Sequence, residues 1–251
     1  MKKTITKNWC LVPVLVGAMA VSAYGQLVLS DDFEGETPTW DASNGSPTLS
    51  TDQNNTPGGN QSLFIANTGD RATWNDFGTL NAFSLTFYYY ADSEDLGTNP
   101  RNYGQVQSRA VAGDVNSDLD QLFAIGNYHA DGHDTSTYQY RVVSGDTAGW
   151  FDFDPDVIEV SNDEWVEFNI TRTTENVVTF SVNGTVGATI TDAALGDISI
   201  VDLGGLGFAT TEQPAYFDDM TLIPEPSTYA AIFGALALAG AFVMRRRRSV
   251  K

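Results

Sequence analysis

The sequence predicts an all-β protein, a single β-sandwich flanked by apolar segments at both termini. Strict alternation of apolar and polar residues in Phe83–Tyr90 and Val166–Thr171 is typical of strands with one buried face. Asn183-Gly184 joins two further alternating segments, and this dipeptide favours a tight hairpin because both residues tolerate positive φ. No amphipathic helical period occurs between residues 26 and 222. These observations predict a sandwich of antiparallel strands.

Further short strands are expected through the same segment, separated by turns rich in Asp, Asn, Gly and Pro, most clearly at Asp52–Asn60. Many short strands joined by polar turns favour a sandwich or jelly roll as one domain, 26–222. The expected strands are Leu27–Ser30, Ser62–Ala66, Val106–Val111, Leu122–Tyr128, Tyr138–Val143, Val178–Val182, Val186–Ile190, Ile198–Leu203 and Tyr216–Leu222.

The first 25 residues have the three-part organisation of a secretory signal peptide, here as a short apolar helix. Three lysines precede an apolar run, Leu11–Val21, and small residues follow it. Cations of this kind stay on the cytoplasmic side while the short apolar segment enters Sec-type export machinery. Cleavage after Ala23 and cleavage after Gly25 both fit. The only cysteine, Cys10, lies in this segment, so we expect no disulfide in the mature protein.

The final segment, 223–251, predicts a short transmembrane helix behind a proline-rich lead. An uncharged run, Thr228–Met244, reaches roughly 25 Å as a helix, which is marginal for the inner membrane. A cluster of cations after it predicts a cytoplasmic C-terminus. The motif residues are Pro224, Glu225 and Pro226, followed by Arg245, Arg246, Arg247 and Arg248.

These parts, in this order, resemble the PEP-CTERM sorting signal. The resemblance implies that an exosortase, a transpeptidase-like membrane enzyme of Gram-negative bacteria that make extracellular polysaccharide, reads and removes the tail. An ordinary single-pass anchor with a proline-rich stalk remains the alternative. Both interpretations anchor the chain in the inner membrane before any processing and place residues 26–222 outside the cytoplasm, at the cell surface or beyond.

The segment between the two ends is strongly acidic. All but one of the 32 acidic residues fall within it, so its net charge is about −26, against −19 for the whole chain. Such a surface repels phosphate backbones, which excludes nucleic-acid binding. Aromatic residues spread through it can supply a core, which excludes disorder. It has no lysine, and its only basic residues are Arg71, Arg101, Arg109, Arg141 and Arg172.

Parts of the domain also resemble the LamG-like, concanavalin A-like jelly rolls. Trp165–Arg172, continued through Asn183-Gly184, is similar to their central hairpin, and residues 31–35 and 217–220 are similar to their first and last strands. The resemblance implies that these terminal strands lie side by side. Like charges held together destabilise a fold, so a structural Ca²⁺ is a candidate cofactor. Its candidate ligands are Asp31, Asp32, Asp218 and Asp219.

The sequence offers no catalytic constellation, so we expect a protein that is not an enzyme. Glu164 and Glu167 have odd spacing and would lie on opposite faces of a strand, whereas a retaining glycosidase needs two carboxyls facing each other. No nucleophile–base signature accompanies the two histidines. Candidate glycan contacts are Tyr88 and Tyr90, which point away from the predicted core, and Trp150, which lies in loop-like sequence.

The sequence therefore predicts an exported, exosortase-sorted cell-surface or extracellular-matrix protein without catalytic activity. Its domain is expected to serve adhesion or polysaccharide association, as in a biofilm. Two alternatives remain open: a glycan-active enzyme of the concanavalin A-like fold, and a calcium-stabilised structural coat protein.

Overall fold

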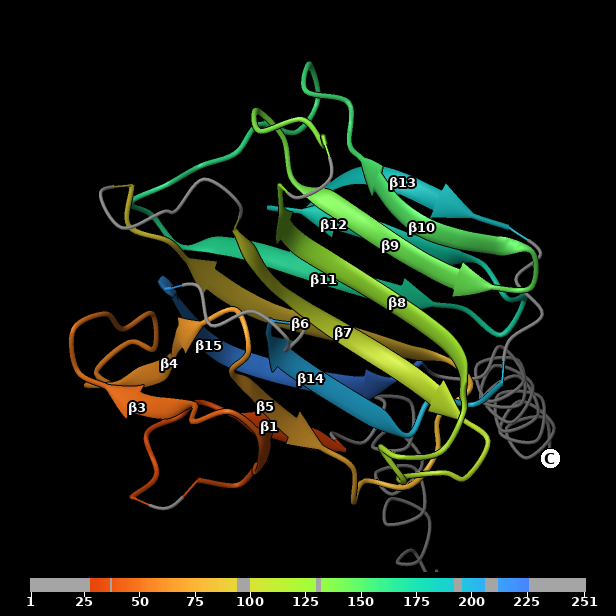
Figure 1. The fold of residues 1–251 in the computed structure, drawn as a ribbon, viewed down its shortest axis with the longest axis horizontal. Coiled ribbons are helices and arrows are strands. Elements are labelled where there is room, and N and C mark those ends of the chain that lie inside the picture. The colour runs from red at the N-terminus through yellow and green to blue at the C-terminus, as the bar shows by residue number, and fades with distance from the viewer. Residues whose placement is uncertain are drawn as a thin grey trace, which may run out of the picture. The chain divides into compact units, whose positions relative to one another are not determined.

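Fifteen strands in the described part of the chain pair into two antiparallel sheets (Figure 1). The structure is a computed structural model, and it describes residues 28–36, 38–93, 100–129, 132–191, 196–205 and 212–225. The predicted signal peptide, 1–25, and the sorting segment from residue 226 onward lie outside these ranges. Within the ranges, no helix is long and apolar enough to cross a membrane.

One sheet has eight strands and contains both the first and the last strand of the described chain. Its strands are β1 (Leu29–Asp31), β3 (Thr48–Ser50), β4 (Ser62–Asn67), β6 (Phe83–Tyr90), β11 (Val166–Arg172), β12 (Val178–Val182), β13 (Thr185–Ile190) and β15 (Glu212–Pro224). The order is β13-β12-β11-β6-β15-β4-β3, and β1 also pairs with β15. The β1–β15 ladder confirms the expectation that the terminal strands are neighbours.

The other sheet has seven strands and lies in front of the first in Figure 1. Its strands are β2 (Asp41–Asn44), β5 (Arg71–Trp74), β7 (Arg101–Arg109), β8 (Leu119–Tyr128), β9 (Gln139–Ser144), β10 (Thr147–Asp152) and β14 (Ile200–Gly204). The order is β10-β9-β8-β7-β14-β5-β2. Consecutive strands β7 to β10 form a meander, and β14 and β5 complete the sheet from distant parts of the sequence.

The hydrophobic core lies between the two sheets. Residues of β6 alternate between buried and partly exposed along its whole length, as the sequence predicted. The Phe87 ring packs against Phe168 and Phe217, with ring centroids 5.5 and 5.9 Å apart. A Cβ atom on Gly104, which faces this core from β7, would lie 2.3 Å from the Phe87 ring. Only glycine lets the sheets approach this closely.

The predicted hairpin is confirmed between β12 and β13. Asn183 and Gly184 both have positive φ, 48° and 75°, and Val182 pairs with Thr185 across the turn. The Asn183 Oδ1 atom also accepts a hydrogen bond of 2.9 Å from the Glu167 backbone N–H. The side chain therefore ties the hairpin to the adjacent strand β11.

Sequence patterns missed β2, β3, β5 and β10, and they placed the start of β7 five residues late. Nearly every residue of β7 is buried on both faces, so apolar and polar residues do not alternate with burial. Trp150 was predicted in loop-like sequence, but it lies within β10. The domain was expected to end at residue 222, whereas β15 continues to Pro224. Alternation detects strands with one wet face, and β3, β5, β7 and β10 lack that contrast.

Candidate functional site

The outer face of the seven-stranded sheet, the face directed away from the core, carries a row of side chains in register. In β14, Val201 and Leu203 enter the core, which turns Asp202 to the outer face. Asp202 pairs with Thr73 on one side and Gln105 on the other, and Ala124 separates Gln105 from Arg141. From β5 to β10 the row reads Thr73, Asp202, Gln105, Ala124, Arg141 and Trp150.

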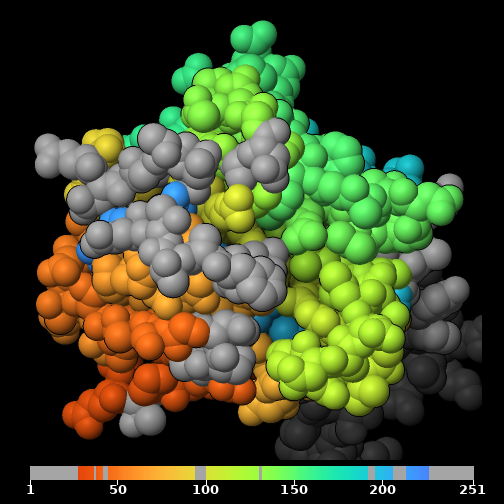
Figure 2. Space-filling model, viewed as in Figure 1, coloured from red at the N-terminus to blue at the C-terminus, as the bar shows by residue number. Residues whose placement is uncertain are grey.

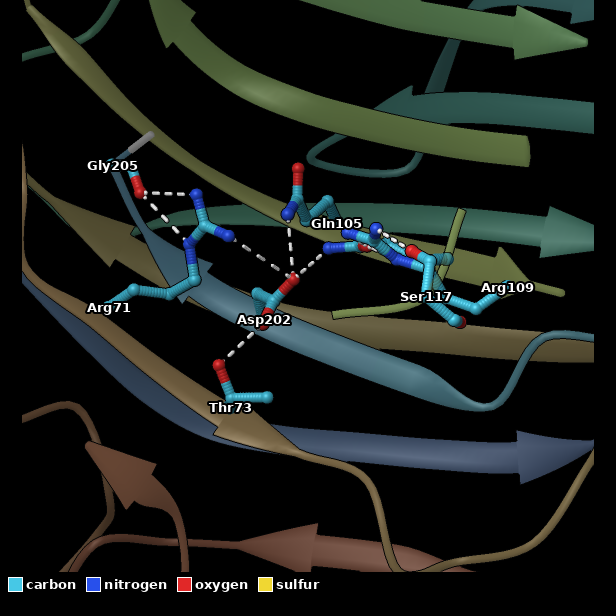
Figure 3. A network of polar contacts seen from close by, with 8 residues as sticks. Arg71, Thr73, Gln105, Arg109, Ser117, Asp202 and Gly205 are labelled. Carbon is cyan, nitrogen blue, oxygen red and sulfur yellow. Dashed lines mark hydrogen bonds and ion pairs between the residues drawn. The ribbon is translucent and has the colours of Figure 1, made fainter. Parts of the chain in front are cut away.

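Asp202 is the centre of a buried polar network on this face (Figure 3). Its carboxylate accepts hydrogen bonds from Thr73 Oγ1 at 2.6 Å and from Gln105 Nε2 at 2.6 Å, and Gln107 Nε2 also donates to it. The Arg71 guanidinium lies 3.9 Å away and completes an ion pair. A buried carboxylate is stable only with such partners. We call these five residues the Asp202 network.

Two arginines on this face are held by carbonyl oxygens. Arg71 donates from Nε and Nη2 to the Gly205 backbone oxygen, at 3.0 and 2.9 Å. Arg109 donates from Nε to Gln107 Oε1 at 2.8 Å and from Nη1 to the Ser117 backbone oxygen at 2.8 Å. Figure 3 shows both guanidiniums flanking Asp202. Neutral acceptors orient both side chains; Arg71 also faces the Asp202 carboxylate, whereas Arg109 has only neutral acceptors among the described residues.

An aromatic cluster of Tyr103, Tyr128 and Trp150 continues the row toward β10. The rings of Tyr128 and Trp150 stack at 4.2 Å with an angle of 6°, and the Tyr103 ring meets Trp150 edge-on at 4.9 Å. Guanidiniums lie over two of the rings, Arg101 at 5.5 Å from Tyr128 and Arg141 at 5.8 Å from Trp150. Figure 2 looks onto this face, with β7 to β10 in yellow-green and green.

Three buried polar atoms on this face have no hydrogen-bond partner among the described residues: Tyr103 Oη, Gln105 Oε1 and Arg141 Nε. Tyr103 and Gln105 are each 1% exposed. Burial strongly raises the pKa of Tyr103, while the charges of Arg71 and Arg141 oppose this rise. The hydroxyl therefore stays protonated and can donate a hydrogen bond. Buried atoms of this kind indicate a ligand or ordered water, because leaving them unpaired is costly.

The outer face of the eight-stranded sheet carries the other two predicted glycan contacts. Tyr88 and Tyr90 do point away from the core, as predicted. Tyr88 Oη donates to Glu167 Oε2 at 2.9 Å. The Tyr90 ring lies 5.6 Å from Trp165 and 6.0 Å from Tyr216. Both tyrosines thus cover neighbouring strands, and Trp150 lies on the opposite side of the sandwich.

The four candidate calcium ligands are near the β1–β15 ladder, where Asp31 pairs with Met220. Asp31 accepts hydrogen bonds from the Phe33 backbone N–H at 2.9 Å and from the Thr39 hydroxyl. Asp32 accepts one from the Glu34 backbone N–H at 3.2 Å. These contacts shape the turn after β1. In the described part of the chain, no group of three or more His, Cys, Asp or Glu side chains is arranged to hold a metal. Calcium binding stays a prediction.

The register of β15 against β6 shifts between Asp218 and Thr221, and Phe217 and Met220, on either side of Asp218 and Asp219, both enter the core. The loop predicted at Asp52–Asn60 covers them: Asp218 accepts from the Asn55 backbone N–H at 2.7 Å, and Asn55 Nδ2 donates to Asp219 at 2.8 Å. Burial raises the pKa of Asp218, and the charge of Asp219 adds to this rise, whereas the backbone donors lower it.

The predicted sorting motif overlaps the end of β15. Pro224 pairs with Phe83 at the end of β15, and the Glu225 backbone N–H donates to the Ala82 carbonyl at 3.1 Å. Pro226 and the cluster Arg245–Arg248 lie outside the described residues. The first residue of the predicted motif is therefore also the last residue of β15.

Sequence reasoning missed the Asp202 network and Tyr103. The sequence did contain one signal, the scarcity of cations. In a domain with only five arginines, each arginine is a candidate functional residue. Four of them converge on one sheet face, from β5, β7 and β9. Without the strand order, residues 71, 109, 141 and 202 could not be brought together.

No family model and no curated protein matches the chain. Solved structures share its fold at low identity. A carbohydrate esterase of the Shiga toxin-encoding bacteriophage phi24B has a TM-score of 0.56 at 14% identity, covering 80% of this chain and 99% of that chain. A cellulose-induced protein, Cip1, has a TM-score of 0.53 at 14% identity, covering 77% of this chain and 96% of that chain. An endo-β-1,4-glucuronan lyase from the fungus Trichoderma reesei has a TM-score of 0.52 at 14% identity, covering 79% of this chain and 96% of that chain. At this identity the likeness shows the fold alone.

Proposed function

We propose that the chain is an exported, exosortase-sorted surface or matrix protein whose domain binds polysaccharide without cleaving it. The proposal adopts the concanavalin A-like jelly roll as the fold family. The binding surface is the outer face of the seven-stranded sheet. The observation that carries the proposal is the aromatic cluster beside unpaired, buried polar atoms of Tyr103, Gln105 and Arg141.

The chemistry of this face suits a sugar. Glycans present apolar ring faces and a rim of hydroxyl groups, and they are commonly bound by aromatic rings together with a few fixed polar groups. Trp150 and Tyr128 supply the rings, while Tyr103 Oη and Gln105 Oε1 supply a donor and an acceptor. Three fold relatives, an esterase, a lyase and a cellulose-induced protein, are each named after a carbohydrate. They support the class of ligand only by analogy.

Export and sorting rest on the two ends of the sequence. Residues 1–25 contain, in order, lysines, an apolar run and small residues, which suits Sec-type export. The Pro-Glu-Pro motif and the arginines near the C-terminus suit processing by an exosortase and delivery to the cell envelope or beyond. Fractionation of the producing cells tests this part. We expect a form lacking both ends outside the cells, and replacing Pro224-Glu225-Pro226 by alanines should keep the chain in the inner membrane. Full-length chain in the cytosol would overturn it.

Binding is tested with the purified full chain, held in mild detergent, against a panel of immobilised neutral and acidic polysaccharides. We expect retention on at least one of them, and Trp150→Ala should abolish it. The matched control is Phe151→Ala, which removes a neighbouring aromatic ring that stacks on Tyr140 instead. No retention on any member of the panel would contradict the proposal.

A glycan-active enzyme is the second candidate, because two of the fold relatives are named as a lyase and an esterase. The same panel distinguishes the two functions. Release of new reducing ends, of unsaturated sugars or of acyl groups from a bound polysaccharide would establish catalysis. Retention without any of these products supports a binding protein.

A further inference from the structure

Cations in this acidic domain are concentrated on one face. Of the five arginines between residues 26 and 222, four project from β5, β7 and β9 of the seven-stranded sheet: Arg71, Arg101, Arg109 and Arg141. The fifth, Arg172, ends β11 in the other sheet, where it donates to the Gly196 carbonyl at 2.8 Å. A domain with 31 acidic residues and no lysine therefore has one region where positive charge gathers.

Three of these four arginines form no ion pair with a carboxylate among the described residues. Among the described residues, only Arg71 forms an ion pair with a carboxylate, Asp202 at 3.9 Å. Arg109 is held by an amide and a carbonyl oxygen, and Arg101 and Arg141 lie over aromatic rings. Ring contacts orient a guanidinium but leave its charge and most of its donors available.

The donors converge with a buried, unpaired donor and acceptor. Arg141 Nε is buried without a partner among the described residues, and so is Tyr103 Oη. The Arg141 guanidinium and the Tyr103 ring both contact Trp150, at 5.8 and 4.9 Å from its ring. Ala124, between Gln105 and Arg141 in the row, is small enough for the rings of Tyr103 and Trp150 to pack against it. The result is a patch rich in guanidinium groups with an aromatic side.

We propose that this face recognises an acidic glycan, with Arg141 and Tyr103 binding the carboxylate of a uronic acid residue that lies beside the Tyr128–Trp150 stack. The inference rests on the proposed glycan-binding function and specifies the class of sugar. A planar guanidinium matches a carboxylate with two parallel hydrogen bonds, and a neutral sugar offers no counterpart for this charge. Gln105 Oε1 then accepts a hydrogen bond from a ring hydroxyl.

The test compares a short oligoglucuronate with the same oligosaccharide after chemical reduction of its carboxyl groups, so that the two probes differ only in charge. Binding of each to the purified full chain is measured by titration calorimetry in about 0.15 M salt, where the Debye length of ~8 Å screens the overall negative charge of the domain. We expect the reduced probe to bind at least tenfold more weakly.

Arg141→Gln should remove this preference: affinity for the oligoglucuronate falls about tenfold, and affinity for the reduced probe stays within about twofold. Thr174→Glu, in an exposed turn after β11, is the matched control because it changes the net charge equally and lies in the other sheet. It should leave both affinities unchanged. Thermal unfolding of each variant verifies that it is folded.

Each outcome addresses a different claim. Equal affinity for the charged and reduced probes, or an equal effect of the two variants, would overturn the acidic-glycan inference and leave glycan binding intact. Absence of binding to either probe together with no retention on the polysaccharide panel would overturn the proposed function itself. No binding of either probe, with retention on neutral polysaccharides alone, would also overturn the inference.

Discussion

The two outer faces of the sandwich have different polar centres. On the eight-stranded sheet the polar centre is the neutral, half-buried Asn169, whose Nδ2 donates to Ser84 Oγ and Thr86 Oγ1 at 3.0 and 2.8 Å. On the seven-stranded sheet it is the buried, charged Asp202 with Arg71 beside it. Among the described strands, arginines project outward from the seven-stranded sheet, whereas acidic Asp218 and Asp219 project from the eight-stranded one.

This difference helps to locate the functional face of the sandwich. A neutral hydrogen-bond centre stabilises strand pairing at small cost. A buried charge needs several partners merely to be tolerated, so a hydrophobic pair of similar volume would often be at least as stable. The buried Asp202–Arg71 pair is therefore poorly explained by stability alone, which directs the search for function to the seven-stranded face.

The largest expected effect separates the two polar centres. Asp202→Ala leaves Arg71 buried without its carboxylate and removes the acceptor of Thr73 and Gln105, so it should lower the free energy of unfolding by about 3–5 kcal/mol. Asn169→Ala should lower it by only about 1 kcal/mol. Denaturant unfolding measures both, with exposed Asp120→Ala as the reference. Equal losses for the two variants would remove the contrast between the faces.

The next effect concerns cations at the eight-stranded face. If Asp218 and Asp219 bind Ca²⁺ as predicted, the ion at a hundred times its Kd should stabilise the fold by about 2.7 kcal/mol, and a chelator should reverse this. The measurement is a series of melting temperatures at rising Ca²⁺. A variant with both aspartates changed to asparagine should not respond. Identical melting temperatures of the unchanged protein with Ca²⁺ and with chelator would eliminate the site.

A smaller effect compares the aromatic residues of the two faces. Trp150→Ala should weaken binding of the preferred polysaccharide at least tenfold, which is about 1.4 kcal/mol. Tyr90→Ala should leave the affinity within about twofold, because Tyr90 covers Trp165 and Tyr216 in its own sheet. Affinity chromatography on the immobilised polysaccharide distinguishes them. A greater loss for Tyr90→Ala would move the binding site to the eight-stranded sheet.

The smallest expected effect is in the pH dependence of stability. Burial raises the pKa of Asp218 above 3.8, so the folded state binds the proton more tightly, and stability from this group falls as pH rises through the raised pKa. Burial lowers the pKa of His129, after β8, below 6.5, so stability from this group falls as pH drops from 6.5 toward the lowered pKa.

Unfolding free energies measured between pH 4 and 7 should therefore contain two opposing slopes. Asp218→Asn should remove the decline on the acidic side, and His129→Gln should remove the loss below 6.5. Bound Ca²⁺ would also abolish the Asp218 slope, because the cation favours the charged carboxylate. A profile unchanged in either variant would show that the group does not titrate differently on folding.

Local patterns in the sequence determined the elements that have one wet face. The strands β6, β11 and β12 and the Asn183-Gly184 hairpin follow from alternation and from residues that accept positive φ, and both are properties of neighbours along the chain. The strongly acidic composition and the shortage of cations were equally visible.

Only the tertiary structure decided which distant residues meet. The order β9-β8-β7-β14-β5 brings residues 141, 105, 202 and 73 into one row, although β5 and β14 are separated by more than a hundred residues. It also placed Trp150 in a strand and Tyr103 under the arginines. Strand order is set by long-range burial in the shared core, and a single strand's sequence carries its own period but not the identity of its neighbours.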